Sequence, residues 1–149
     1  MRIVETDAAP TVKLKHPILE LALRPGSDVS KRREALEAWY REQLPVAVPP
    51  LLEKWEPMLG VKTRRILVQH MKTKWGSCNP VTGNIRLNTD LARKPSECVE
   101  YILVHELLHL IEPAHNARFQ SLMDRFMPQW RQIRDEVNRL PVRHEDWAY

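Results

Sequence analysis

The segment from Glu97 to Ile111 constrains the fold of this 149-residue chain more than any other. It reads ECVEYILVHELLHLI and is apolar on almost every helical face. A helix at a protein surface is apolar along one stripe only, so this pattern predicts a central helix buried between other elements. Ser96, which follows Pro95, is the predicted N-cap residue of this helix.

Two histidines and a glutamate lie on the predicted helix as His105, Glu106 and His109. Residues four apart lie on one helical face, about 6 Å apart along the axis, so both imidazoles can bind one metal ion. Glu106 is about 100° around the helix from His105 and can reach a water molecule at the metal without being a ligand. The spacing therefore predicts a metal site, and zinc is the ion that such a site favours.

His115 is the predicted third ligand. Glu112 lies on the same helical face, but it stands roughly 10 Å along the axis from His105 and cannot complete the site on a straight helix. Pro113 disfavours helical geometry, so we expect the helix to stop and His115 to turn back towards the metal. Three protein ligands leave the open position of a catalytic zinc site. The alternative third ligands are Asp124, Glu112 and His144.

These residues resemble the YgjP-like metallopeptidase domain, a small zincin family that is more distantly similar to the WLM and SprT families. Two motifs carry the resemblance: His105-Glu106-Leu107-Leu108-His109 followed by His115-Asn116 and Phe119, and Lys74-Trp75-Gly76-Ser77-Cys78. The resemblance implies one zinc ion per chain on His105, His109 and His115, with Glu106 as the general base. The metzincins share the third-His spacing but have Gly at the position of Glu112, which argues against that group.

Patterns elsewhere predict further elements around the central helix. Residues 1–25 alternate loosely and predict a strand or an extended arm. Residues 27–55 predict an amphipathic helix that is interrupted or kinked at Pro45 and starts again at Pro49–Pro50. A strand is predicted from Lys62 through Trp75.

The remaining patterns complete a fold of the α+β class, a minimal zincin-like fold. Residues 75–88 predict a hairpin, residues 116–127 and 128–137 predict two helices, and the tail 141–149 is predicted to be irregular. The expected architecture is therefore a small sheet with a hairpin beside the central His-Glu-x-x-His helix, covered by packed helices.

The predicted hairpin immediately precedes the metal helix. In zincin-like proteins this is where the edge strand that bounds the substrate cleft lies, and such an edge can bind an extended peptide. Ile85 and Leu87 are predicted to face the core, with the alternate residues on the other side. The predicted cleft residues are Trp75, Gly76, Asn84, Arg86 and Asn88. For Trp75 and Gly76 the alternative is packing and a tight backbone approach.

Composition predicts one globular domain over residues 1–149, since 43% of the residues are hydrophobic and 28% are charged. The N-terminus has no apolar run of signal-peptide length, and no segment is long and apolar enough for a membrane helix, so we expect a cytoplasmic protein with no membrane partner. Two cysteines, Cys78 and Cys98, have no CxxC spacing. Neither a disulfide framework nor a Cys-based zinc site is therefore expected.

The net charge of +4 is concentrated in residues 57–95, which contain eight Lys and Arg residues and one acidic residue. Such a segment can attract nucleic acid, and solvated strand faces give the same count with no partner. Three functions are compatible with these features: a zinc-dependent peptidase, a nucleic-acid-associated module that processes proteins, and an interaction domain stapled by zinc. The third has no use for a base at Glu106, which favours a peptidase acting on a peptide or protein.

Overall fold

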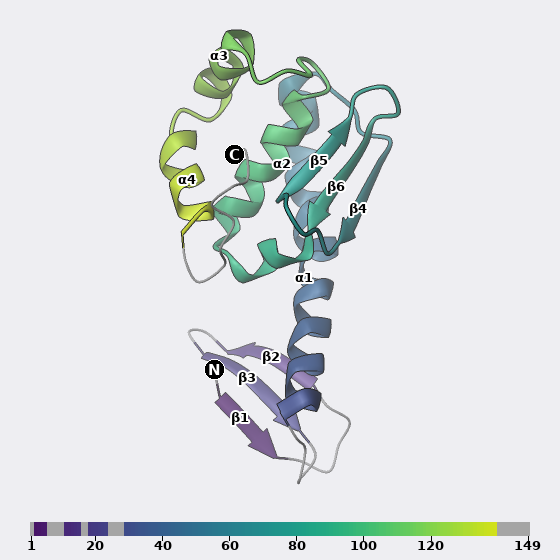
Figure 1. Ribbon diagram of the computed structural model, residues 1–149, viewed down its shortest axis with the longest axis vertical. Coiled ribbons are helices and arrows are strands. Elements are labelled where there is room, and N and C mark those ends of the chain that lie inside the picture. Colours follow the sequence, from purple (N-terminus) through teal and green to yellow (C-terminus); the bar gives the residue numbers. More distant parts are fainter. Residues whose placement is uncertain (1, 6–10, 16–17, 24–28, 140–149) are drawn as a thin grey trace. The chain divides into compact units, whose positions relative to one another are not determined.

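The computed structural model describes residues 2–5, 11–15, 18–23 and 29–139 (Figure 1). The chain divides into two compact units, Met1–Gln43 and Leu44–Tyr149. The second unit contains the segment with the three histidines, so it is the one that positions the candidate site. Within the described residues, no helix combines the length and the apolar character needed to cross a bilayer.

The first unit contains a three-stranded sheet of β1 (Arg2–Glu5), β2 (Thr11–Lys15) and β3 (Ile18–Leu23). Its strand order is β1-β3-β2, with β1 parallel and β2 antiparallel to β3. The alternating sequence of residues 1–25 thus forms three short strands in its described parts.

Helix α1 (Val29–Leu59) is continuous over 31 residues although it contains four prolines. The predicted interruption at Pro45 and new start at Pro49–Pro50 are therefore wrong, and the alternative of a kink at Pro45 stays a prediction. Each proline removes a backbone donor and disfavours the helix locally. The buried side chains of the helix are spaced by four, seven and four residues, so they form one face, and packing of this face stabilises a helix that local propensity opposes. These buried residues are Leu44, Val48, Trp55 and Leu59.

The second unit contains a sheet of β4 (Arg65–Gln69), β5 (Gly76–Asn79) and β6 (Asn84–Asn88) in the order β4-β6-β5. β4 is parallel to β6, and β5 pairs antiparallel with β6 as the predicted hairpin. The predicted continuation of the β4 strand to Trp75 is wrong. After Gln69 the backbone is held by a side chain, because Asn88 Nδ2 donates to the carbonyls of Met71 and Lys74 at 2.9 and 2.8 Å.

Helix α2 (Ser96–Leu108) lies at the centre of this unit and is buried along most of its 13 residues, as its sequence predicted. The 3-10 helix η1 (Thr89–Arg93) precedes it. The β4-β6-β5 sheet lies on one side of α2, and α3 (Ala117–Phe126) and α4 (Trp130–Val137) lie on the other (Figure 1). This arrangement confirms the predicted α+β fold.

The N-terminus of α2 differs from the prediction. Pro95 occupies the N-cap position, so the predicted Ser96 cap is wrong, and no side chain caps this end. Proline has no side-chain acceptor for the first helical N–H groups. The helix is therefore held by its packing rather than by a cap. The tail 141–149 and its predicted irregular structure lie outside the described residues.

Candidate metal centre

The three predicted ligands converge at the C-terminal end of α2. The Nε2 atom of His109 lies 2.8 Å from that of His115 and 3.2 Å from that of His105, and the His105 and His115 atoms are 3.0 Å apart. Ligands about 2.0–2.1 Å from a zinc ion stand about 3.4 Å apart in a tetrahedron, so these nitrogens are spaced to share one ion. Among the described residues, this is the only group of three or more His, Cys, Asp or Glu side chains close enough to hold a metal.

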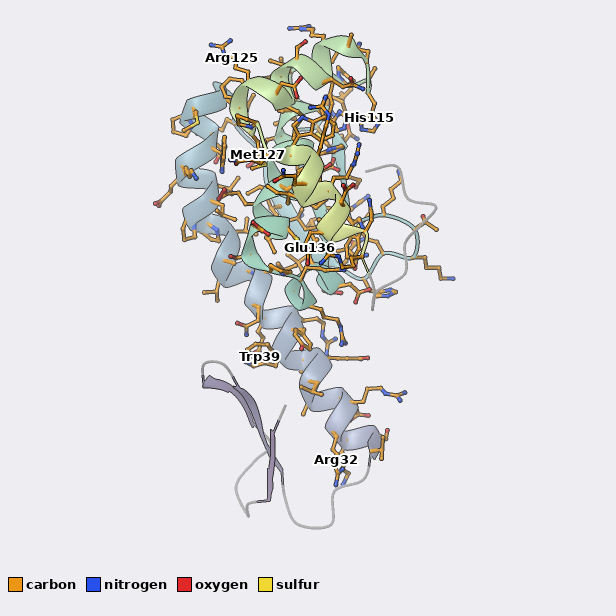
Figure 2. All side chains as sticks on the ribbon, turned by 90° about the vertical axis from the view of Figure 1, so that its left-hand side faces the viewer. Arg32, Trp39, His115, Arg125, Met127 and Glu136 are labelled. Atoms are coloured by element: carbon orange, nitrogen blue, oxygen red, sulfur yellow. The ribbon has the colours of Figure 1, made fainter. Side chains whose placement is uncertain are left out.

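A tight turn after α2 brings the third histidine back. The helix ends at Leu108, three residues before the predicted end at Ile111, and the amide of Glu112 still donates to the Leu108 carbonyl at 2.9 Å. Pro113 follows, and its missing N–H and fixed backbone angle prevent a further helical turn. The chain reverses there, and His115 lies beside α3 at the far end of the unit from Glu136 of α4 (Figure 2).

The backbone carbonyl of Glu112 fixes the tautomer of His109. Nδ1 of His109 lies 3.0 Å from this oxygen. A carbonyl oxygen can only accept, so Nδ1 carries the proton and Nε2 keeps its lone pair for a metal. Metal-binding histidines commonly donate their second N–H to a carbonyl or carboxylate in this way.

Burial lowers the pKa of all three imidazoles. The effect is largest at His105, whose pKa lies well below its ordinary value because of burial and then repulsion from His109 and His115. Burial also lowers the pKa of His109, against an opposing contribution from its hydrogen bond to Glu112, and it lowers the pKa of His115. The imidazoles are therefore neutral at pH 7, which is the form that binds metal.

Phe119 on α3 forms an apolar wall against the three imidazoles. Its ring stacks on His109 with centroids 4.5 Å apart and lies 4.9 Å from His105 and 5.2 Å from His115. Asn116 caps α3 by accepting the Phe119 N–H at 3.0 Å, which fixes the first turn of the helix. The sequence identified Phe119 only as part of the motif that includes the three histidines. Its spacing of four residues from His115 is the signal that could have placed it at the site.

Glu106 lies next to the cluster on α2 but contributes none of its converging atoms. Its side chain is buried, with the residue 2% exposed. Burial and then the charge of Glu106 raise the pKa of the Cys78 thiol on β5 to about 12. Glu106 is thus close to the hairpin, and it follows His105 directly in α2.

Of the predicted cleft residues, the structure brings only Gly76 against the site. A Cβ built on Gly76 would lie 3.2 Å from Cγ of Glu106. Trp75 and Asn88 are fully buried, and the Asn88 amide is used by backbone groups of the chain. The alternate strand positions Asn84 and Arg86 lie on the sheet face opposite to Gly76, since Gly76 pairs with Leu87.

The alternative third ligands are not at the centre. The carboxylate of Glu112 accepts from Asn116 at 2.6 Å, and that of Asp124 accepts from Trp130 Nε1 at 2.8 Å. Neither carboxylate belongs to the converging group. His144 lies outside the described residues.

An α+β domain with three neutral imidazoles facing one point beside a buried glutamate has the donor set and fold of a metal-dependent hydrolase. The family model described as YgjP-like, metallopeptidase domain, matches residues 1–140 of the chain. The chain therefore belongs to the YgjP-like metallopeptidase family, as its motifs predicted. Its class of activity is that of a metal-dependent peptidase.

Two solved structures are similar to this chain. The crystal structure of the metallopeptidase zymogen of Pyrococcus abyssi abylysin has a TM-score of 0.56 and 25% sequence identity, and the match covers 61% of this chain and 91% of that one. The metallopeptidase zymogen of Methanocaldococcus jannaschii jannalysin has a TM-score of 0.54 and 21% identity, covering 61% and 87%. The second likeness concerns the fold alone. A comparison with curated proteins gave no match.

Proposed function

We propose that this chain is a zinc-dependent peptidase in which His105, His109 and His115 hold one zinc ion and Glu106 is the general base. The observation that carries the proposal is the convergence of three Nε2 atoms within 3.2 Å of one another. Three Nε2 lone pairs that face one point repel one another, whereas one cation placed between them can accept a lone pair from each imidazole. Three imidazoles and an open fourth position are the donor set of a catalytic zinc site.

When bound, zinc would polarise the scissile carbonyl and lower the pKa of a water molecule towards 7. Glu106 accepts the proton of that water and passes it to the leaving amine. The carboxylate is suited to this role because it is adjacent to the ligands and its atoms are not among the converging ones. The Phe119 ring packs against all three imidazoles and restricts their orientation.

The substrate in this proposal is a peptide or protein segment bound in an extended form along β5. β5 is an edge strand of its sheet, and its pairing among the described strands is with β6. An extended peptide can add to such an edge through main-chain hydrogen bonds, which give affinity with little dependence on sequence. The close approach of Gly76 to Glu106 supports this proposal, because it brings β5 near the proposed base.

The competing hypotheses have no comparable observation in their favour. Neither the family match nor the similar structures support a nucleic-acid partner for the basic segment 57–95. A purely structural zinc site gives no reason for a buried carboxylate at Glu106 beside the ligands.

Metal content and its effect on cleavage test the proposal together. We expect protein purified without chelators to contain about one zinc ion per chain by elemental analysis. Cleavage of unfolded casein or of a mixed peptide library should be lost with a chelator and restored by zinc. Protein with no transition metal, or cleavage that survives metal removal, would overturn the proposal.

A further inference from the structure

Glu112 contacts His109 directly, and it also contacts Asn116, the residue that follows His115. We propose that Glu112 is a positioning residue, which orients His109 through its main-chain carbonyl and fixes His115 through its carboxylate. This inference rests on the proposed function, because it requires the three histidines to bind a metal. It assigns the residue a role other than that of the alternative ligand suggested by its helical face.

The first contact uses the main chain. The Glu112 carbonyl accepts the Nδ1 proton of His109 at 3.0 Å, and the Glu112 amide donates to the Leu108 carbonyl at 2.9 Å. Both polar groups of this residue's backbone are therefore committed to the end of α2. The carbonyl is available to His109 because the helix has ended and no further helical N–H competes for it.

The second contact uses both carboxylate oxygens. Oε1 accepts from Nδ2 of Asn116 at 2.6 Å, and Oε2 accepts from Nη1 of Arg118 at 3.3 Å. Asn116 directly follows His115, so these bonds close the short loop Pro113–His115 on both sides. The Glu112 side chain is 14% exposed, which limits the competition from water for these bonds.

Asn116 links the Glu112 carboxylate to α3. Its Nδ2 group donates to Glu112 while its Oδ1 atom accepts the N–H of Phe119, which stacks on His109. One side chain therefore ties the loop to the helix that backs the imidazoles. Arg118 is 64% exposed, so its ion pair with Glu112 contributes less than the short charge-assisted bond from Asn116.

Of the three predicted ligands, His115 depends most on the hydrogen bonds of the Glu112 carboxylate. His105 and His109 are buried at the end of α2, whereas His115 is exposed in a loop. Core packing therefore holds the first two imidazoles, but local hydrogen bonds must hold the third. A side chain that is already held in its binding conformation loses less conformational entropy when the metal binds. The hydrogen bonds of Glu112 therefore raise the affinity for the metal.

Substitution of Glu112 tests this role with zinc itself as the probe. Glu112→Ala removes the carboxylate and keeps the main-chain carbonyl, so we expect zinc affinity to fall by about tenfold or more in chelator competition. The visible spectrum of bound Co²⁺ should change because His115 is no longer held. Glu112→Gln keeps an acceptor for Asn116 and should restore most of the affinity. Wild-type affinity and cobalt spectrum in Glu112→Ala would overturn the inference.

Asn116→Ser provides a second variant that keeps the α3 cap. A serine oxygen can still accept the Phe119 N–H, but it has no amide to donate to Glu112. It should reproduce most of the loss seen in Glu112→Ala, and the double variant should lose little more than Glu112→Ala, because both changes break the same Asn116–Glu112 bond. If the losses of zinc affinity in the two single variants add up in the double variant, Glu112 and Asn116 do not act through one bond. The matched control is Glu53→Ala, an exposed carboxylate on α1, which should bind zinc as wild type does.

The wild-type control separates the two proposals. If wild-type protein binds neither zinc nor cobalt, the proposed function fails and this inference fails with it. If wild-type protein binds zinc and Glu112→Ala binds it equally well, only the role of Glu112 is wrong. The unfolding midpoint of the metal-free proteins, measured alongside, should stay close to wild type in Glu112→Ala, since the loss is in ligand placement.

Discussion

Gly76 on the hairpin and Glu106 on the central helix are packed so closely that no larger residue fits at position 76 without displacing a neighbour. A Cβ built on Gly76 would lie 3.2 Å from Cγ of Glu106, 3.1 Å from Cγ2 of Ile102 and 3.0 Å from the carbonyl oxygen of Arg86. Gly76 is not among the positive-φ glycines, so glycine is required here by close approach and not by backbone conformation. The hairpin therefore packs on α2 at the predicted base.

Gly76→Ala should impair catalysis more than metal binding. The added methyl group must push Glu106 or the hairpin aside, and a small misplacement of a catalytic group can cost up to about 10² in rate. We expect kcat/KM to fall by about tenfold or more while zinc content stays near wild type, because the nearest neighbours of the added methyl group belong to Arg86, Ile102 and Glu106 and not to a histidine. Ser77→Ala, on the opposite sheet face, is the matched control. Wild-type turnover in Gly76→Ala would show that the contact does not position Glu106.

Glu106→Gln tests whether Glu106 takes part in the reaction or only maintains the structure of the site. The change keeps size and polarity but removes the base, so hydrolysis should fall by about 10² or more while zinc content and thermal stability stay near wild type. Elemental analysis, thermal unfolding and peptide cleavage measure the three quantities. Loss of zinc in this variant would make Glu106 a ligand, and unchanged turnover would exclude it as the base.

Replacement of the ligands should couple metal loss to stability. Zinc that binds only the folded chain stabilises it by about 2.7 kcal/mol at a free concentration of 100 times Kd. His105→Ala and His109→Ala should each lose zinc, and a chelator should then no longer lower their melting temperature. His115→Ala should bind zinc more weakly than wild type. Full zinc content in both His105→Ala and His109→Ala would place the ligands elsewhere.

The predicted ligand set came from information that is local in the sequence. The four-residue spacing of His105 and His109 fixes a common helical face, and Pro113 marks where the chain must turn. The residues that position these ligands could not be predicted from the sequence in the same way. Phe119 and Glu112 act through contacts that exist only after the turn is formed, and no periodic pattern encodes a carbonyl that accepts from His109.

Predictions failed where tertiary packing overrides a local rule. Pro45 disfavours a helix locally, but the buried face that includes Leu44 and Val48 keeps α1 continuous. Strand alternation assigned Asn88 to an outer face, whereas its amide is drawn inward by the carbonyls of Met71 and Lys74. A buried Asn is stable there because each donor finds a partner, and alternation alone does not reveal that.

The stability of the metal-free protein should fall as pH decreases from 7.5 to 5.5. The folded state lowers the pKa of His105, His109 and His115 below the ordinary value of 6.5, chiefly by burial. Below pH 6.5 the unfolded chain therefore binds more protons than the folded chain, and acid favours unfolding. The contribution of the three neutral imidazoles to stability is fully present above pH 6.5. It is lost as the pH falls through their lowered pKa values.

Urea unfolding in the presence of a chelator measures this dependence directly. His105→Ala removes the imidazole with the largest depression of pKa, so its free energy of unfolding should change less between pH 7.5 and 5.5 than that of the wild type. Ser121→Ala, an exposed change on α3 that alters no titratable group, is the matched control and should keep the wild-type slope. A wild-type stability that rises on acidification, or a His105→Ala slope equal to the wild-type slope, would mean that the imidazoles are not held neutral by the fold.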